Sequence, residues 1–471
     1  MKKLFTILAA VSIFLLLSRC QKDAAISPVQ EQAQELAVNL QGLAESLDLD
    51  PLFIAKEMAA VAEWPVEVEM ASEGVSPRGI GVHGYYRRVI ADDIAHYSFT
   101  VRIGSGPYDR IGIHRVVKEW SPNRPARTTK ALFYQHGDAK NFVGMMLPGI
   151  NSPNTARDFG MATYLARNGV DVWGIDQAWN LVPEGVTDFS FMADWGVDKQ
   201  QKDLRRAMAI ARLARYLTGG PNEAMILAGY SSGAVTGFAA LNAETQIAPG
   251  QRNIKGFIPV DLMIKTDNQG IHDLFASEYY RTQALLDNEE YQDFIPFQML
   301  GQLGRNEPDA ESPIFPGFTN LQAALFMGTG PIFGDGQSHY IAGVWENDFP
   351  IGLQYVSLEQ WFDFLETATL YEPALFIQDC GVMISDVVDS PFDDHFAEIT
   401  VPILNFGAYG GLGYLAEYAF SRIGSTDVTH HIIQLMPDGQ GLMDFAHIDI
   451  FIASNAEEVA WQPLLEWISA H

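Results

Sequence analysis

Cysteine and basic residues are scarce in this chain, and each scarcity excludes a class of protein. Only two of the 471 residues are cysteine, too few for a scaffold held by several disulfides. Lys and Arg number 30 against 58 Asp and Glu, a formal net charge of −28. Because nucleic acid binds to cationic surfaces, no nucleic-acid partner is expected. With 48% hydrophobic residues, the chain can nevertheless bury a large core.

A hydrophobic run near the N-terminus, from Leu4 to Leu17, is too short to span a membrane comfortably. It follows Lys2 and Lys3 and precedes Ser18-Arg19-Cys20, a layout typical of a secretory signal peptide. We therefore expect residues 1–19 to be a signal peptide and the protein to be exported.

Cys20 resembles the lipobox cysteine of bacterial lipoproteins, which becomes the lipidated first residue of the mature protein. Arg19 departs from that pattern, since a small residue normally precedes the cysteine. Gln21-Lys22-Asp23 resembles a surface-export tag of bacterial lipoproteins. The resemblance implies a lipid anchor on Cys20 at the outer membrane or cell surface, with a periplasmic or secreted protein or an uncleaved anchor as alternatives. Cys380 then has no disulfide partner and is expected in the core.

Residues 20–94 begin rich in Ala, Gln, Glu and Leu and are predicted to be a tether with a helical or irregular segment. From Ala95 onward, strand-like runs form an expected antiparallel meander, and strands and helices then alternate. The predicted strands are 96–103, 111–120, 131–135, 170–175, 224–229, 254–260, 402–406 and 431–435. The predicted helices are 156–168, 199–217, 234–243, 412–423 and a broken helix 448–468. This alternation predicts an α/β fold with a mostly parallel sheet and helices on both faces.

Residues 262–398 interrupt the alternation and are rich in aromatic residues, Pro and Gly. They are predicted to form a cap inserted between two parts of the core, 95–261 and 399–471. The aromatic side chains have two equally weighted interpretations, which are the lining of an apolar substrate cleft and the cap's own core.

Gly229-Tyr230-Ser231-Ser232-Gly233 matches the pattern Gly-x-Ser-x-Gly between a predicted strand and a predicted helix. Glycines are needed there because bulky neighbours of a sharp strand-to-helix turn would collide with both elements. Such a turn exposes the Ser231 hydroxyl near a helix N-terminus, which favours developing negative charge. Ser231 is therefore predicted to be a nucleophile; the alternative is an ordinary Gly/Ser-rich turn.

Four segments together resemble the α/β-hydrolase superfamily. They are the His136-Gly137 turn, the segment from Asp171 to Asp176, the Ser231 turn and the segment around His447. The resemblance implies that the cap follows the strand ending at Asp261. It also implies ester cleavage through an acyl-enzyme, with no metal or organic cofactor.

In that superfamily a histidine after the last core strand takes the nucleophile's proton. His447 occupies this place, and the sequence around it resembles the His-x-Asp segment of acid-lipase-like hydrolases. The alternative is that His447 is an ordinary surface histidine. The oxyanion donors would be the backbone N–H groups of Ser232 and Asp138, the latter following a His-Gly element like that of lipases and esterases. A carboxylate beside an oxyanion is unfavourable, so the Asp138 side chain is expected to turn away.

The acid that orients the histidine is the point at which this sequence departs from the superfamily pattern. No carboxylate follows the strand 402–406, and Glu417 lies too far into the next helix. Some lipases place the acid one core strand earlier, where this chain has Asp261. Asp444, three residues before His447, is the other candidate for this acid. The alternative role for Asp261 is to cap the turn that follows its strand. Asp449 is expected to anchor the first turn of the final helix.

The expected function is hydrolysis of a small-molecule or lipid-like carboxylic ester by a Ser231, His447 and Asp261 triad. Amide, lactone, thioester or carbon–carbon bond hydrolysis on the same triad is the alternative; dehalogenases and epoxide hydrolases carry Asp in place of Ser231. Gly411-Leu412-Gly413 also resembles a dinucleotide-binding motif, although too few strands remain to complete that fold. The missing acid after Phe406 favours another rival, an inactive hydrolase-fold lipoprotein that binds at the cell surface.

Overall fold

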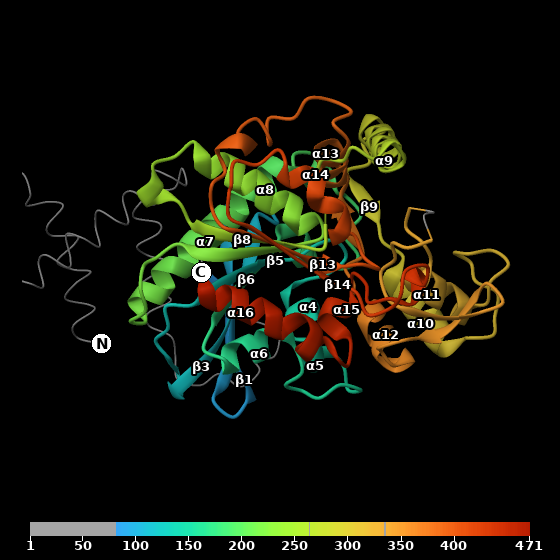
Figure 1. Cartoon of the computed structure of the whole chain (residues 1–471), viewed down its shortest axis with the longest axis horizontal. Helices are drawn as coiled ribbons and strands as arrows, with labels where there is room; N and C mark the ends of the chain where they lie inside the picture. The colour runs from blue at the N-terminus through green and yellow to red at the C-terminus, as the bar shows by residue number, and fades with distance from the viewer. Residues whose placement is uncertain (1–81, 263, 334–335) are drawn as a thin grey trace, which may run out of the picture.

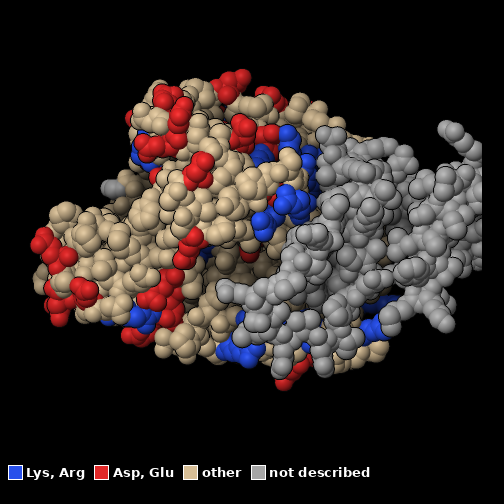
Figure 2. All heavy atoms as spheres, turned by 180° about the vertical axis from the view of Figure 1, so that it is seen from behind, with Lys and Arg blue, Asp and Glu red and all other residues tan. Residues whose placement is uncertain are grey.

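The computed structural model describes residues 82–262, 264–333 and 336–471. The predicted signal peptide (1–19), Cys20 and the segment up to residue 81 lie outside the described residues. Within the described part of the chain, no helix combines the length and the apolar character that crossing a membrane requires. Acidic side chains occur at several separate places on the face shown in Figure 2, as expected for a charge spread along the chain.

A ten-stranded mixed sheet forms the centre of the molecule, in the order β1-β2-β3-β6-β5-β7-β8-β13-β14 with β4 beside β3 (Figure 1). The strands β1, β2, β3 and β6 pair antiparallel, and those from β6 to β14 pair parallel. The strands are β1 (Val82–Ala91), β2 (Ile94–Arg102), β3 (Arg110–Ser121), β4 (Arg124–Pro125), β5 (Ala131–Gln135), β6 (Asp171–Asp176), β7 (Met225–Tyr230), β8 (Ile254–Val260), β13 (Ile403–Ala408) and β14 (Val428–Ile433). The predicted meander and mostly parallel sheet are confirmed.

Helices cover both faces of the sheet, because successive strand residues point to opposite sides. Phe133 packs in one core cluster with α7 (Val197–Leu217) and α8 (Ser232–Thr245). Its neighbour Leu132 packs in the other cluster, on the side of a second group of helices. These are α4 (Phe142–Met146), α5 (Pro148–Asn151), α6 (Met161–Arg167), α15 (Asp449–Ile452) and α16 (Gln462–Ala470). The central parallel strands are buried on both faces, which explains their continuous apolar runs.

The sheet begins earlier than the sequence predicted. Residues up to 94 were expected to be a tether and irregular segment, but β1 starts at Val82. This strand lies at the edge of the sheet and carries charged residues, so it lacks the apolar pattern of a core strand. The Arg87 guanidinium pairs with Glu119 of β3, which satisfies that charge.

Two other predicted elements differ from the structure. The segment 412–423, predicted to be one helix, forms a 3-10 turn at Gly413–Ala416 and a single turn α14 at Glu417–Phe420. The last strand spans Val428–Ile433 instead of 431–435, because this partly exposed edge strand pairs in register with β13. Polar, exposed residues such as Thr429 at its beginning give this strand no continuous apolar run.

The segment between β8 and β13 contributes none of its described residues to the central sheet. Its strands form two separate antiparallel pairs, the hairpin of β10 with β11 and the long-range pair of β12 with β9. Its elements are α9 (Gln269–Asp287), β9 (Gln292–Phe294), α10 (Phe297–Asn306), α11 (Asn320–Thr329), β10 (Gly343–Glu346), β11 (Phe349–Leu353), α12 (Leu358–Glu366), β12 (Tyr371–Pro373) and α13 (Ala374–Ser385). Aromatic residues such as Trp361 form its buried interior, whereas Tyr280 and Phe294 are exposed. Cys380, expected in the core, is buried in α13.

Candidate active site

Ser231 lies at the turn between β7 and α8, as the sequence predicted. Its backbone has φ 54° and ψ −132°, a conformation that a residue with a side chain adopts only when the surrounding structure enforces it. The Ser231 N–H donates to the Val260 carbonyl at 3.1 Å. A Cβ atom on Gly233 would lie 2.3 Å from the His136 carbonyl oxygen. As predicted, only glycine fits at this position without a steric clash.

Asp261 and His447 come together beside this turn. Asp261 follows β8, and β8 pairs in parallel with β7 through Val260 and Tyr230. His447 Nδ1 lies 2.7 Å from Asp261 Oδ2, and both side chains are buried. A carboxylate only accepts hydrogen bonds, so Nδ1 carries a proton, and in the neutral ring Nε2 is the nitrogen with the lone pair. No hydrogen bond joins Ser231 Oγ to His447 within the described chain; such bonds commonly tighten when substrate binds.

The Asp261 carboxylate is fixed by three backbone N–H groups in addition to His447. Ala408 and Gly413 donate to Oδ1 at 2.7 and 2.8 Å, and Leu412 donates to Oδ2 at 3.0 Å. A Cβ atom on Gly411 would lie 2.0 Å from Oδ2. The Gly411-Leu412-Gly413 motif therefore wraps around this carboxylate, which argues against the dinucleotide-binding interpretation and explains why no helix forms there.

Asp444, the competing acid, does not contact the histidine ring. Its Oδ1 accepts from the backbone N–H groups of Leu435, Met436 and Phe445. Tyr230 stacks on the His447 ring with centroids 4.5 Å apart, and its hydroxyl donates to the His447 carbonyl at 3.3 Å. The ring is thus held between Tyr230 and Asp261.

Asp449 was expected to anchor the first turn of the helix that it begins, and this expectation was wrong. Its Oδ2 instead accepts from Ala446 N at 3.0 Å, just before His447, and from Ala342 N at 2.9 Å, in the segment between β8 and β13. The Ile448 N–H donates to the Tyr340 carbonyl at 2.7 Å, which holds the segment of Ala342 against this loop and within reach of Asp449. Asp449 therefore joins the His447 loop to the segment around Ala342.

This buried carboxyl predicts a pH-dependent stability. Burial raises the pKa of Asp449 to about 8, and the charge of Asp444 adds to the increase, while the Ala342 and Ala446 N–H groups oppose it. The folded protein then holds a proton that the unfolded chain releases near pH 4, so this contribution to stability is complete at low pH and is lost as the pH rises toward 8. Asp449→Asn, which stays neutral, is expected to raise the melting temperature by about 2–4 °C at pH 9 and to change it little at pH 5. Equal shifts in thermal unfolding at both pH values would contradict this.

The loop after β5 lies against Ser231. A Cβ atom on Gly137 would be 2.6 Å from Ser231 Cβ, so only glycine lets the loop approach this closely. The backbone N–H groups of Asp138 and Ser232 donate to none of the described residues. Two free donors thus lie at neighbouring strand ends, where the sequence predicted the oxyanion donors.

The Asp138 carboxylate accepts a hydrogen bond from the Ser232 hydroxyl. Solvent reaches this side chain, although surrounding protein raises the pKa of its carboxyl, and the Ser232 hydroxyl and His447 oppose that increase. The next residue, Ala139, has φ 60° and is held from both sides. Its N–H donates to Glu372 Oε1, and its carbonyl accepts from Thr369 N at 2.8 Å.

The side chains behind this loop were missed by the sequence analysis. His136 Nε2 accepts from Gln177 N at 3.0 Å, and its Nδ1 donates to the Gly137 carbonyl at 2.8 Å, so the ring is neutral with a fixed tautomer. Burial lowers the pKa of His136. Glu372 reaches the loop from β12, a contact for which the sequence holds no signal because 233 positions separate it from Ala139.

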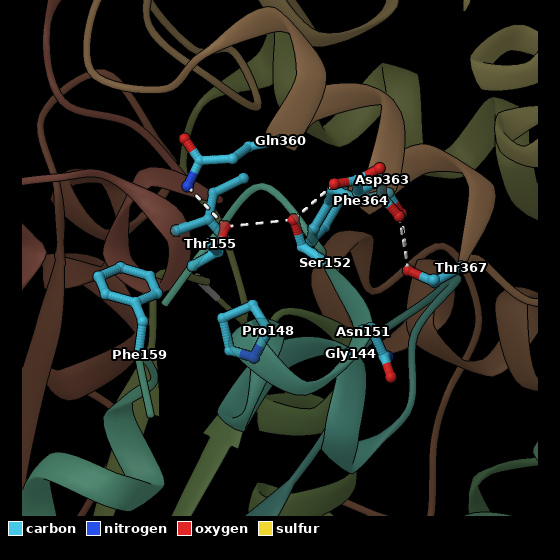
Figure 3. Close-up of a pocket in the computed structure, with 11 residues that line it drawn as sticks. Gly144, Pro148, Asn151, Ser152, Thr155, Phe159, Gln360, Asp363, Phe364 and Thr367 are labelled. Atoms are coloured by element: carbon cyan, nitrogen blue, oxygen red, sulfur yellow. Dashed lines mark hydrogen bonds between the residues drawn. The ribbon is translucent and has the colours of Figure 1, made fainter. Parts of the chain in front are cut away.

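A small pocket lies apart from these residues, between α12 and the segment that contains α5 (Figure 3). Ser152 Oγ donates to Asp363 Oδ2 at 2.5 Å, and Gln360 Nε2 donates to Thr155 Oγ1 at 2.8 Å. None of the predicted catalytic residues lines it. Its hydrogen bonds fasten α12 to the core. Within the ranges that the structure describes, no cluster of three or more His, Cys, Asp or Glu side chains could hold a metal ion.

Comparison with known proteins gives similarity in structure only. No protein-family model and no curated protein matches the sequence. A candidate lipase from Sulfolobus solfataricus is 18% identical with a TM-score of 0.55, over 82% of this chain and 99% of that one. A soluble variant of monoglyceride lipase from Saccharomyces cerevisiae is 10% identical (TM-score 0.41; 85% and 99%). A bacterial brefeldin A esterase is 15% identical (TM-score 0.36; 98% and 90%). The first of these similarities shows the fold.

Proposed function

We propose that this chain, which has the α/β-hydrolase fold, is a serine hydrolase of carboxylic esters. The observation that supports this most is the hydrogen bond of 2.7 Å between His447 Nδ1 and Asp261 Oδ2 beside Ser231. In the neutral ring this bond leaves Nε2 of His447 with a lone pair that can take the serine proton.

The proposed reaction proceeds in two halves. Ser231 Oγ attacks the ester carbonyl while His447 Nε2 takes its proton, and the Asp261 carboxylate stabilises the resulting imidazolium. The backbone N–H groups of Ser232 and Asp138 donate to the oxyanion. The alcohol leaves with the proton from His447, and an acyl group remains on Ser231. His447 then takes a proton from water, the resulting hydroxide attacks the acyl carbon, and the carboxylic acid is released as Ser231 regains its proton.

The substrate class is proposed more broadly. The name of the Sulfolobus structure supports an ester, either a small molecule or a lipid-like compound. Amide, lactone and thioester hydrolysis use the same groups and are the alternatives. The hypothesis of an inactive binding lipoprotein depended on the missing acid after Phe406. Because the Asp261 carboxylate contacts His447, that argument for the hypothesis no longer applies.

The test is covalent labelling followed by a substrate panel. A fluorophosphonate probe is expected to add one phosphonyl group per chain, at Ser231, as measured by peptide mass spectrometry. A panel of nitrophenyl esters, lactones, thioesters and anilides is expected to give the highest kcat/KM with an ester. A label elsewhere, or no label, would overturn the proposal, and a preference for another carbonyl would change the substrate class.

We further propose that the protein is exported and anchored through a lipid on Cys20. The support is the sequence of residues 1–23 alone. Cys20→Ser is expected to move most of the protein from the membrane fraction to the soluble fraction, because the lipid anchor is lost. An unchanged distribution between the two fractions would contradict the anchor.

A further inference from the structure

The two proposed oxyanion donors are linked through their own side chains. Gln135 of β5 pairs with Gly229 of β7, and Asp138 and Ser232 each lie three residues beyond these partners. The Ser232 hydroxyl donates across this gap to Asp138 Oδ1. The bond therefore joins the end of one parallel strand directly to the start of the helix that follows its neighbour.

The loop that carries Asp138 is fixed on both sides of this residue. On one side, Gly137 contacts Ser231, where a Cβ atom would approach the Tyr230 carbonyl oxygen to 2.7 Å. On the other, Ala139 is held by Glu372 and Thr369. The N–H of Asp138 lies between these two points, and the bond to Ser232 Oγ is the hydrogen bond that its own side chain makes.

We propose that Asp138 is a positioning residue, whose carboxylate binds the Ser232 hydroxyl and thereby fixes the separation and direction of the two oxyanion donors. The inference rests on the proposed function. Oxyanion donors act only at about 2.7–3.1 Å from the developing charge, and small displacements lower the rate strongly. A side-chain bond between the residues that carry the two donors keeps them in place before the substrate arrives.

The bond also accounts for an acidic residue next to an oxyanion. One carboxylate oxygen is occupied by the Ser232 hydroxyl, so the charge is stabilised by a donor instead of facing the reacting oxygen unpaired. Burial raises the pKa of Asp138, and the charge of nearby His447 opposes that increase; in the proposed reaction His447 becomes positive in the transition state. The positive charge on His447 therefore offsets the repulsion between the Asp138 carboxylate and the oxyanion most strongly in the transition state.

The test is a double-mutant cycle on ester turnover with Asp138→Ala, Ser232→Ala and the double variant. Each variant keeps both backbone N–H groups. Each single change is expected to lower kcat by about 10- to 100-fold with KM within about twofold. The double variant is expected to lose no more than either single one, because one bond is lost in all three. Asp138→Asn keeps an accepting oxygen and is expected to retain at least half of the wild-type kcat.

Ser152→Ala is the matched control, because it removes another serine-to-carboxylate hydrogen bond of the same chemistry, in the small pocket of Figure 3. It is expected to leave kcat within about twofold. Losses that multiply in the double variant, a change in KM alone, or an Asn variant as slow as the Ala variant would overturn the inference. A wild-type protein without turnover that depends on Ser231 would overturn the proposed function as well, so the two failures are distinguishable.

Discussion

Ser231→Ala is expected to lower ester turnover by about 10⁴- to 10⁶-fold, because it removes the hydroxyl proposed to be the nucleophile. Ser232 carries the neighbouring hydroxyl, but that hydroxyl already donates a hydrogen bond to Asp138. The N–H groups of Ser232 and Asp138 remain in the variant. A residual rate above that of the uncatalysed reaction is therefore expected.

This loss is measured by end-point assays of nitrophenyl ester hydrolysis. The enzyme concentration must be high enough to detect the residual rate. Ser232→Ala is the matched control, since it removes a hydroxyl one position away and is expected to lose about 10- to 100-fold. Equal turnover in wild type and Ser231→Ala would refute a serine nucleophile. If both serine variants lose activity equally, the labelling experiment decides which serine is the nucleophile. A phosphonyl group found on Ser232 would then move the nucleophile to that residue.

The turn that carries Ser231 could be predicted because its information is local. A strand, two glycines forced by close packing and a helix follow one another within a short stretch. Asp261 was predicted to meet His447 because some lipases place the acid at the end of this strand, and parallel strands bring their carboxyl ends to one edge of the sheet. In both cases the order of elements along the chain determines which residues meet.

Other contacts depend on geometry that the order of elements does not contain. Glu372 reaches the Asp138 loop from a short strand in the segment between β8 and β13, and that segment follows no repeating pattern. Asp449 binds N–H groups outside its own helix because the segment from Tyr340 to Ala342 lies against the His447 loop. The first strand was missed because it carries charged residues; Arg87 pairs with Glu119 on β3, a contact that no local pattern indicates.

Asp261→Asn is expected to lower kcat by about 10⁴-fold, because an amide cannot satisfy all the donors that surround this side chain. Oδ1 accepts two backbone N–H groups, and Oδ2 accepts Leu412 N and His447 Nδ1. The amide oxygen replaces the oxygen that makes two backbone bonds, which turns the amide nitrogen toward Leu412 and the ring. His447 Nδ1 must then accept a hydrogen bond, its proton moves to Nε2, and Nε2 can no longer take the proton of Ser231.

Asp444→Asn is the control for this prediction, because it makes the same chemical change three residues from His447. Its carboxylate binds backbone N–H groups and makes no contact with the ring, so turnover is expected to stay within about threefold of wild type. Thermal unfolding of both variants separates a loss of folding from a loss of chemistry. If Asp444→Asn is the slower enzyme and Asp261→Asn keeps most of its activity, the acid of the proposed triad is Asp444, and the Asp261 carboxylate serves only to hold the turn at Gly411.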